Sequence, residues 1–252
     1  MKDTIAVVRH NLAVARDTCH MVLDCDAGPI VPGQFVMLKV DAMSELFLRR
    51  PLAVLKSDSG YLELLYKLKG RGTIELSRKK PGEAVSVLGP LGKGFSMPRP
   101  DEEVVYLAGG TGLPPVMALA EFLQRGCFIF GARSKEDIPL WERISTIPGI
   151  TALAVTEDGT MGFKGVVTEA FLDHVSRHGR PHVVYACGPH LMLKKVAELS
   201  ERLDIRCEMS LEEYMACGFG VCSACAVKTE SGNMRVCTHG PVFNARALKW
   251  GV

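Results

Sequence analysis

Three cysteines lie within nine residues of the stretch YMACGFGVCSACAVKT, and a fourth follows in NMRVCTHG. These residues, Cys217, Cys222, Cys225 and Cys237, have the spacing C-x4-C-x2-C-x11-C. Thiolates at the x4 and x2 spacing, with a more distant fourth, are typical of plant-type [2Fe–2S] clusters. The spacing therefore predicts that these cysteines bind such a cluster, which transfers one electron at a time.

A structural zinc ion or a set of free thiols would also account for four clustered cysteines. A zinc ion bound by four cysteines usually takes them from two C-x2–4-C pairs, whereas three of these cysteines share one loop. Gly218 and Gly220 allow that loop to curl around a cluster. The small residues at 223 and 224 let backbone N–H groups approach the sulfurs. These features favour the iron–sulfur interpretation.

The remaining cysteines are scattered through a chain of ordinary composition. Apolar residues make up 47% and charged residues 23% of the 252 residues, and the net charge of +2 gives no reason to expect binding to nucleic acid or to an anionic membrane. No signal peptide or membrane span is visible, so we expect a cytoplasmic protein. Cytosolic thiols stay reduced. The scattered cysteines are therefore expected to be small core residues: Cys19, Cys25, Cys127, Cys187 and Cys207.

Three regions of the chain differ in residue composition and in apolar pattern. Residues 1–98 contain short β-type runs broken by Gly and Pro, which predict an antiparallel barrel or sandwich. Residues 99–206 alternate strand and helix patterns, which predicts a parallel sheet with helices on its faces. Strands are expected over 127–133, 150–158 and 182–189, and helices over 135–145, 166–179 and 190–203. Residues 207–252 are rich in Gly and Cys, and so short a region is expected to need a bound metal to stabilise its fold.

Two glycine-containing loops in the second region are candidates for nucleotide binding. The first is the turn Gly109–Gly112, which follows a strand and precedes a helix opened by Pro114 and Pro115. Such a turn lets a phosphate approach backbone N–H groups at the positive end of a helix, but a tight structural turn has the same residues. The second is YACGP at 185–189, where Cys187 is equally consistent with a core residue. Because ligands bind at the carboxyl ends of parallel strands, both loops are predicted to face one site.

The first region holds two basic and glycine-containing segments. LRRPLAV contains Arg49 and Arg50, and LLYKLKGRGT contains Gly70, Gly72 and Thr73. An arginine beside a glycine-rich turn is suited to a pyrophosphate group. A solvated basic edge followed by a hairpin turn accounts for the same residues, and the sequence leaves both possibilities open.

In this order, the motifs resemble the ferredoxin–NADP reductase superfamily, in which a flavin-binding β-barrel precedes a nicotinamide-binding α/β domain. Within it, MACGFGVCSAC resembles the electron-transfer subunits of NAD-dependent dihydroorotate dehydrogenases. PGQFVML, RRPLAV, KGRGT, LGPLGKGF, AGGTGLPPV, TEDGTMGFKGVVT and YACGP also stand where that family has them. The resemblance covers essentially the whole chain. It implies an FAD-binding barrel at 1–98, an NAD-binding α/β domain at 99–206 and a [2Fe–2S] domain at 207–252.

The resemblance also implies particular cofactor contacts. FAD would lie beside Arg50, Pro51, Leu52 and Ala53 on one side and Leu65, Tyr66 and Lys67 on the other, with Gly72 and Thr73 at its phosphates. NAD(H) would be framed by Gly110, Thr111, Gly112, Cys187, Gly188 and Pro189. Ala53 lacks the hydroxyl that a Ser or Thr offers the flavin ring in much of the superfamily.

The implied activity is that of a redox subunit. An FMN-containing catalytic partner would oxidise dihydroorotate to orotate in pyrimidine biosynthesis, and electrons would pass through the cluster and FAD to NAD+. The expected assembly is a heterotetramer of two catalytic and two such subunits. We find no pair of acid–base residues placed for substrate chemistry in this chain, which agrees with that division of labour.

Two further functions remain open at the level of sequence. Related subunits serve NAD(P)H-dependent ferredoxin reductases, sulfide dehydrogenases and hydrogenases, so the same modules could meet another partner. The alternative from a different functional class is a nucleotide-binding module that is stabilised by zinc and has no redox role. The choice between NAD and NADP rests on FGARSKED, where Arg133 and Lys135 are followed by Glu136 and Asp137. A 2′-phosphate needs basic neighbours, so the two acidic residues favour NAD.

Overall fold

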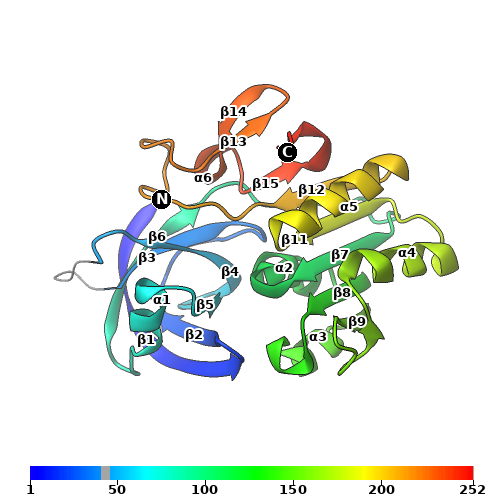
Figure 1. Cartoon of the computed structure of the whole chain (residues 1–252). Coiled ribbons are helices and arrows are strands. Elements are labelled where there is room, and N and C mark those ends of the chain that lie inside the picture. Colours follow the sequence, from blue (N-terminus) through cyan, green and yellow to red (C-terminus); the bar gives the residue numbers. More distant parts are fainter. Residues whose placement is uncertain (41–45, 252) are drawn as a thin grey trace.

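The computed structural model describes residues 1–40 and 46–251. A β-barrel forms the N-terminal part and a helix-flanked sheet the middle part, and the C-terminal region lies across the top of both in Figure 1. Among the described residues, no helix is both long enough and apolar enough to cross a membrane.

The barrel closes in the strand order β1-β2-β5-β4-β3-β6, with every neighbouring pair antiparallel. In β1, Ala6 and Val8 are buried while Ile5 and Val7 are exposed, as expected for a strand with one face in a core. The barrel prediction is confirmed. Its elements are β1 (Lys2–Ala15), β2 (Thr18–Asp24), β3 (Phe35–Lys39), β4 (Arg50–Asp58), β5 (Tyr61–Lys67), α1 (Arg71–Ser77) and β6 (Ala84–Leu91).

The segment KGRGT is the start of a helix, so its interpretation as a hairpin turn was wrong. Helix α1 begins at Arg71, directly after the N-cap Gly70. The Thr73 hydroxyl oxygen accepts hydrogen bonds from the backbone N–H groups of Lys69 (3.0 Å) and Gly70 (3.2 Å). These bonds hold the chain as it enters the helix, and so they fix the loop that borders the cavity described below.

The middle part is a seven-stranded sheet in the order β10-β9-β8-β7-β11-β12-β15. The first six strands run parallel, and β15 is antiparallel to β12. The strands are β7 (Val104–Gly109), β8 (Gly126–Ala132), β9 (Ile150–Thr156), β10 (Phe163–Lys164), β11 (Val183–Cys187), β12 (Arg206–Ser210) and β15 (Val242–Asn244). Because β12 reaches Ser210, the sheet continues past the expected boundary at residue 207.

Helices cover both faces of this sheet, as predicted. Alternate residues of β7 point to opposite faces: Tyr106 packs with α2 and α3, and Leu107 packs with α4 and α5. The expected helix over 135–145 is divided into a 3-10 turn and a short helix, because Pro139 has no N–H to continue a helix. The helices are η1 (Gly110–Gly112), α2 (Leu113–Leu123), η2 (Lys135–Asp137), α3 (Trp141–Ser145), α4 (Val167–His178) and α5 (His190–Arg202).

The C-terminal region has little regular structure and shares the core of the sheet. Cys225, Val236 and Phe243 belong to the same buried cluster as Leu107 of β7. Its elements are the hairpin β13 (Ala226–Thr229) and β14 (Gly232–Arg235), α6 (Val236–His239), β15, and η3 (Ala245–Ala247). The region is thus held to the sheet by apolar packing and by the pairing of β15 with β12.

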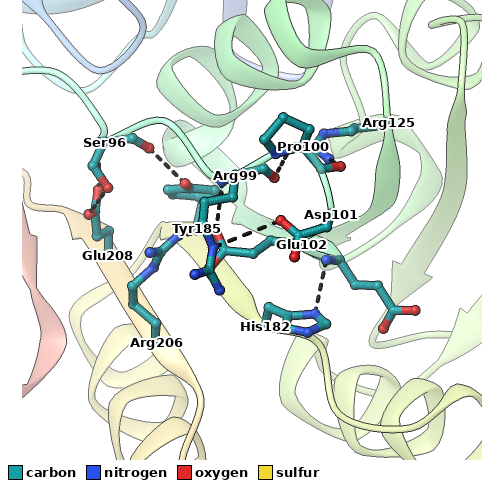
Figure 2. Close-up of polar contacts among 11 residues, drawn as sticks. Ser96, Arg99, Pro100, Asp101, Glu102, Arg125, His182, Tyr185, Arg206 and Glu208 are labelled. Carbon is teal, nitrogen blue, oxygen red and sulfur yellow. Dashed lines mark hydrogen bonds and ion pairs between the residues drawn. The ribbon is translucent and has the colours of Figure 1, made fainter.

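The connection between barrel and sheet is fixed by polar contacts (Figure 2). The Ser96 N–H donates to the Glu208 carboxylate at 2.9 Å, and the Tyr185 hydroxyl donates to the Ser96 carbonyl at 2.7 Å. Further along, Arg206 Nη2 donates to Glu102 Oε2 at 2.9 Å. Both Tyr185 and Glu102 are buried. These contacts attach the connection to β11 and β12, and thereby set the barrel's position against the sheet.

Candidate redox site

A cavity of about 400 Å³ lies where the barrel, the sheet and the C-terminal region meet. The barrel contributes Phe35, Pro51, Leu52, Ala53, Leu65, Tyr66, Lys67, Lys69 and Thr73. The sheet contributes Thr111, Pro114, Pro115, Cys187 and Ser210, and the C-terminal region contributes Leu211, Glu212, Glu213, Tyr214, Met215 and Pro241. The cavity therefore collects side chains from each of the three regions that differ in residue composition and in apolar pattern.

Most of the residues expected to contact cofactors line this cavity or border it. Those in its wall are Pro51, Leu52, Ala53, Leu65, Tyr66, Lys67, Thr73, Thr111 and Cys187. The others, Arg50, Gly72, Gly110, Gly112, Gly188 and Pro189, lie on the adjoining backbone segments and are not in its lining. A smaller cavity that shares Leu65, Tyr66, Lys67 and Thr111 with it also reaches Gly110.

Arg50 lies against the first turn of α1. A Cβ atom built on Gly72 would come within 2.0 Å of Arg50 Nε, so only glycine leaves room for the guanidinium there. Arg50 also donates a hydrogen bond to the Leu48 carbonyl. Together with Lys67 and Lys69, it places positive charge at the barrel side of the cavity, which suits an anionic phosphate group.

Tyr66 joins the cavity to the rest of the barrel. Its hydroxyl donates to Asn11 Oδ1 at 2.8 Å, and Asn11 Nδ2 donates to the carbonyls of Leu76 (2.9 Å) and Lys79 (3.2 Å). Burial, followed by the nearby Cys19 thiol, raises the pKa of Tyr66 well above its ordinary value. The phenol is thus protonated at neutral pH, and Asn11 ties it to the end of α1.

The two glycine-containing loops of the sheet are in contact. A Cβ atom on Gly112 would lie 2.3 Å from the Cys187 carbonyl carbon and oxygen, so the loops approach more closely than any side chain would permit. Cys187 is 1% exposed, and burial raises the pKa of its thiol well above the ordinary value. A neutral thiol therefore forms the cavity wall at the carboxyl ends of β7 and β11.

The segment that closes the cavity from the C-terminal side was not predicted from the sequence. Glu212 accepts a hydrogen bond from the Thr111 hydroxyl at 3.0 Å and lies 3.9 Å from Lys69 Nζ. Its only sequence signal is its position just before the cysteine motif. The complete set of lining residues that was missed is Phe35, Lys69, Pro114, Pro115, Ser210, Leu211, Glu212, Glu213, Tyr214, Met215 and Pro241.

The four cysteines of the motif lie on two neighbouring segments. The sulfurs of Cys217 and Cys222 are 3.3 Å apart, and the Cys225 thiol is close enough to Cys237 to raise the pKa of that residue. Cys222 is exposed, whereas Cys225 and Cys237 are each 2% exposed. Among the described residues, no group of three or more His, Cys, Asp or Glu side chains is arranged to hold a metal ion. The scattered cysteines are all buried, as predicted.

Backbone N–H groups surround the first pair. Burial raises the pKa of Cys217, but hydrogen bonds from the N–H groups of Cys222, Phe219 and Val221 outweigh burial and lower that pKa to about 6. Cys217 is therefore largely a thiolate at neutral pH, the form that binds metal. Burial and the Cys225 thiol raise the pKa of Cys237 to about 11, against a smaller opposing effect of the Gly220 N–H.

Comparisons with known proteins agree with this arrangement. Residues 106–198 match the oxidoreductase NAD-binding domain, and residues 212–249 match the iron–sulfur cluster binding domain of dihydroorotate dehydrogenase B. The structure of an NADH-dependent reduced ferredoxin–NADP oxidoreductase superposes with a TM-score of 0.88 at 27% identity, covering 98% of this chain and 90% of the other. A ferredoxin–NADP+ reductase from Neisseria gonorrhoeae has the same fold at 15% identity, with a TM-score of 0.68 over 81% of this chain and 92% of its own.

Fold and site thus define an oxidoreductase subunit with a ferredoxin–NADP reductase-like core and an added iron–sulfur region. The chain is 36% identical over 249 residues to the dihydroorotate dehydrogenase B (NAD+) electron transfer subunit of Desulforamulus reducens, covering 94% of each. It is 38% identical over 219 residues to the probable counterpart in Pyrococcus furiosus, covering 86% of this chain and 81% of the other. The chain belongs to the family of dihydroorotate dehydrogenase B electron transfer subunits.

Proposed function

We propose that this chain connects an FMN-containing catalytic subunit, which oxidises dihydroorotate, to NAD+. Its resident cofactors would be a [2Fe–2S] cluster and FAD. When bound, the flavin exchanges single electrons with the cluster and hydride with the nicotinamide, so it links one-electron to two-electron chemistry. The observation that carries the proposal is the single cavity lined by barrel, sheet and C-terminal residues.

The barrel side of the cavity fits FAD. Arg50 and Lys69 offer cationic donors for a pyrophosphate group, and the cavity wall also contains the Thr73 hydroxyl and the apolar side chains of Pro51 and Leu52. Ala53 presents no hydroxyl, so at this position the chain can offer a flavin ring only backbone groups. Tyr66, kept protonated and tied to Asn11, shapes the opposite wall.

The sheet side fits NAD(H). The close contact of Gly112 with Cys187 brings the ends of β7 and β11 together, at the edge where parallel sheets bind nucleotides. The neutral Cys187 thiol adds no charge to the place where a nicotinamide would meet the flavin. Thr111 lines the cavity beside this edge and donates a hydrogen bond to Glu212 of the C-terminal region.

The four cysteines fit a two-iron cluster. Two sulfur pairs are what such a cluster needs, since its two irons take four cysteine ligands. We assign Cys217 with Cys222 to one iron, because their sulfurs are in contact, and the buried Cys225 and Cys237 to the other. Backbone N–H groups around Cys217 would stabilise the thiolate and adjust the reduction potential.

An exposed apolar surface beside the cysteines is a suitable docking surface for the catalytic subunit. Tyr214 is 94%, Phe219 44% and Val221 76% exposed, and all three lie in the segment that carries Cys217 and Cys222. Clustered exposed apolar and aromatic side chains are typical of protein interfaces. We name Tyr214, Phe219 and Val221 the docking surface, and we propose that two copies of this chain flank two catalytic subunits.

The decisive experiment isolates the native complex under anaerobic conditions. We expect one FAD, two irons and two acid-labile sulfides per copy of this chain, together with an FMN-containing partner. The complex should reduce NAD+ with dihydroorotate as the electron donor. Absence of iron and sulfide, or co-isolation of a partner that does not oxidise dihydroorotate, would contradict the proposal.

A further inference from the structure

Arg235 is the last residue of β14 and lies directly before α6, the short helix that carries Cys237. Its side chain is half-buried, and Nη1 donates a hydrogen bond to the Gly220 carbonyl at 3.0 Å. Gly220 belongs to the loop that carries the other three cysteines of the motif. Arg235 thus joins two segments that are fifteen positions apart in the sequence.

Gly220 is held from both sides. Its carbonyl accepts the bond from Arg235, and it lies two residues before Cys222. A Cβ atom at this position would lie 2.8 Å from the Thr238 side chain, and φ is +95°, so the backbone is packed directly against α6. The geometry of this one residue therefore depends on α6 and on Arg235 together.

Backbone hydrogen bonds complete the connection between loop and helix. The Val236 N–H donates to the Cys225 carbonyl at 3.0 Å and so links α6 to the cysteine loop, while the Arg235 N–H donates to His239 Nδ1 at 3.1 Å within the segment of α6 itself. These contacts involve neutral groups, whereas the guanidinium bond to Gly220 is charge-assisted, a class that is stronger than neutral hydrogen bonds. The positive charge also stays close to the cysteine motif, because the Gly220 that it contacts lies two residues before Cys222 and Arg235 lies two residues before Cys237.

We propose that Arg235 is a positioning residue for the iron–sulfur centre, which holds the loop of Cys217, Cys222 and Cys225 against α6 and makes the bound cluster easier to reduce. The inference rests on the proposed function, since it takes the four cysteines as ligands. A cluster bound by four thiolates is anionic and gains one more negative charge on reduction. A nearby cation stabilises the reduced form more than the oxidised form, and net charge and hydrogen bonds are among the factors that set such potentials.

Three variants of the purified complex separate the two effects. Arg235→Met keeps the length of the side chain but removes the charge and the hydrogen bond. Arg235→Lys keeps the charge but loses the planar guanidinium group that reaches the Gly220 carbonyl. Lys228→Met is the control, because Lys228 lies on the same hairpin with an exposed side chain and, within the described residues, no side-chain hydrogen bond or ion pair. For each protein, the rate of iron loss to a chelator, the electron paramagnetic resonance spectrum and the midpoint potential are measured.

We expect Arg235→Met to lose iron about tenfold faster or more, the scale typical of residues that orient metal ligands, and to have a more negative midpoint potential. Arg235→Lys should lose iron faster than wild type, but its midpoint potential should be closer to the wild-type value than that of Arg235→Met. Lys228→Met should match wild type in both. FAD content and circular dichroism report the fold independently of the cluster. If Arg235→Met does not fold, the chelation rate and potential of Arg235→Lys test the proposal instead.

The outcomes also distinguish this inference from the proposed function. Wild-type complex without iron would refute the proposed function and the inference with it. Wild-type complex with iron, together with Arg235 variants that match it in chelation rate, spectrum and potential, would refute the inference alone. An equal potential shift in Lys228→Met would show a general effect of charge and would likewise count against a specific role of Arg235.

Discussion

At the scale of single residues, the cysteines proposed as cluster ligands can be separated from the cavity proposed for FAD. Cys222 is exposed and pairs with Cys217, and neither lines the cavity. We expect Cys222→Ser to abolish the cluster absorbance and to lower iron and sulfide per chain, while FAD content and NADH-dependent dye reduction stay close to wild type. Ala224→Ser places the same hydroxyl on the same loop and should retain the cluster. Loss of FAD from Cys222→Ser would contradict separate sites.

Gly72 gives a second prediction at this scale. A Cβ at Gly72 would displace the Arg50 guanidinium, since it would lie 2.0 Å from Nε. Losing one charge-assisted contact costs about 1.5–3 kcal/mol, so we expect Gly72→Ala to raise the dissociation constant for FAD about tenfold or more, measured by flavin fluorescence. Gly70→Ala is the control: two residues earlier, its Cβ would have open space and its φ is −161°. Equal FAD affinity in both variants would exclude this role of Arg50.

The part of the site that could be predicted consists of residues in short local motifs. Leu52, Thr111 and Cys187 each lie beside a strand end that a few neighbouring residues identify. Asn11 and Glu212 could not be found in this way, because they reach Tyr66 and Thr111 across 55 and 101 positions of the sequence. Such contacts depend on how the barrel, the sheet and the C-terminal region pack, and no local pattern encodes that.

At the scale of elements, an ionic cluster joins β5 of the barrel to α2 and α3 beside the sheet. Arg143 Nη1 donates to Glu63 at 2.6 Å and Arg143 Nε to Glu121 at 2.6 Å, while His20 lies 3.2 Å from Glu63. Burial raises the pKa of Glu63, but the hydrogen bonds from His20 and Arg143 outweigh it and lower the pKa to about 2. The charged side chains of this cluster therefore hold the barrel against the helices of the sheet.

The lowered pKa of Glu63 gives the sign of its pH dependence. A carboxyl whose pKa falls from 4.5 to about 2 on folding stabilises the protein above pH 4.5 and loses that effect as the pH falls toward 2. We expect Glu63→Gln to lower the free energy of unfolding by roughly 3 kcal/mol at neutral pH. The difference from wild type should shrink below pH 4.5, as followed by thermal unfolding. Glu75→Gln, which breaks the exposed pair with Arg78, should change stability by less than about 0.5 kcal/mol.

The helices and strands could be predicted from the sequence where they are long enough to show a periodic apolar pattern. Helices α4 and α5 and strands β9 and β11 lie within the expected ranges, and β8 begins one residue before its expected range, because each has a clear apolar pattern. Helix α1 was missed since Gly70 and Gly72 resemble a turn, although Thr73 caps the helix start. Strand β15 has only three residues and forms by pairing with β12, so a distant partner decides it.

At the scale of the whole molecule, the C-terminal region connects the exposed cysteine loop to the cavity. The segment from Leu211 to Met215 lines the cavity, and Cys217 follows two residues later. The docking surface lies on the same short stretch of chain. A partner bound there would lie beside the cysteines and close to the cavity, because Tyr214 belongs both to the docking surface and to the cavity wall. This arrangement suits a subunit that receives electrons at the cysteines and passes them on to the cavity.

The docking surface gives the prediction for the assembled protein. A carboxylate in place of an exposed apolar side chain at an interface loses packing and becomes desolvated, so we expect Val221→Asp to weaken binding of the catalytic subunit about tenfold or more. Dihydroorotate-dependent NAD+ reduction should fall at limiting partner concentration. NADH-dependent dye reduction by this chain should persist, because Val221 does not line the cavity.

Leu12→Asp is the matched control for the docking surface, since Leu12 is 59% exposed on β1 of the barrel and remote from the cysteine loop in sequence. Titration of each variant with the catalytic subunit, followed by light scattering, measures both affinity and stoichiometry. Wild type and Leu12→Asp should reach the mass of a two-plus-two assembly, whereas Val221→Asp should need higher concentrations to do so. If only Leu12→Asp fails to assemble, the partner binds to the barrel, and the exposed side chains beside Cys222 have another purpose.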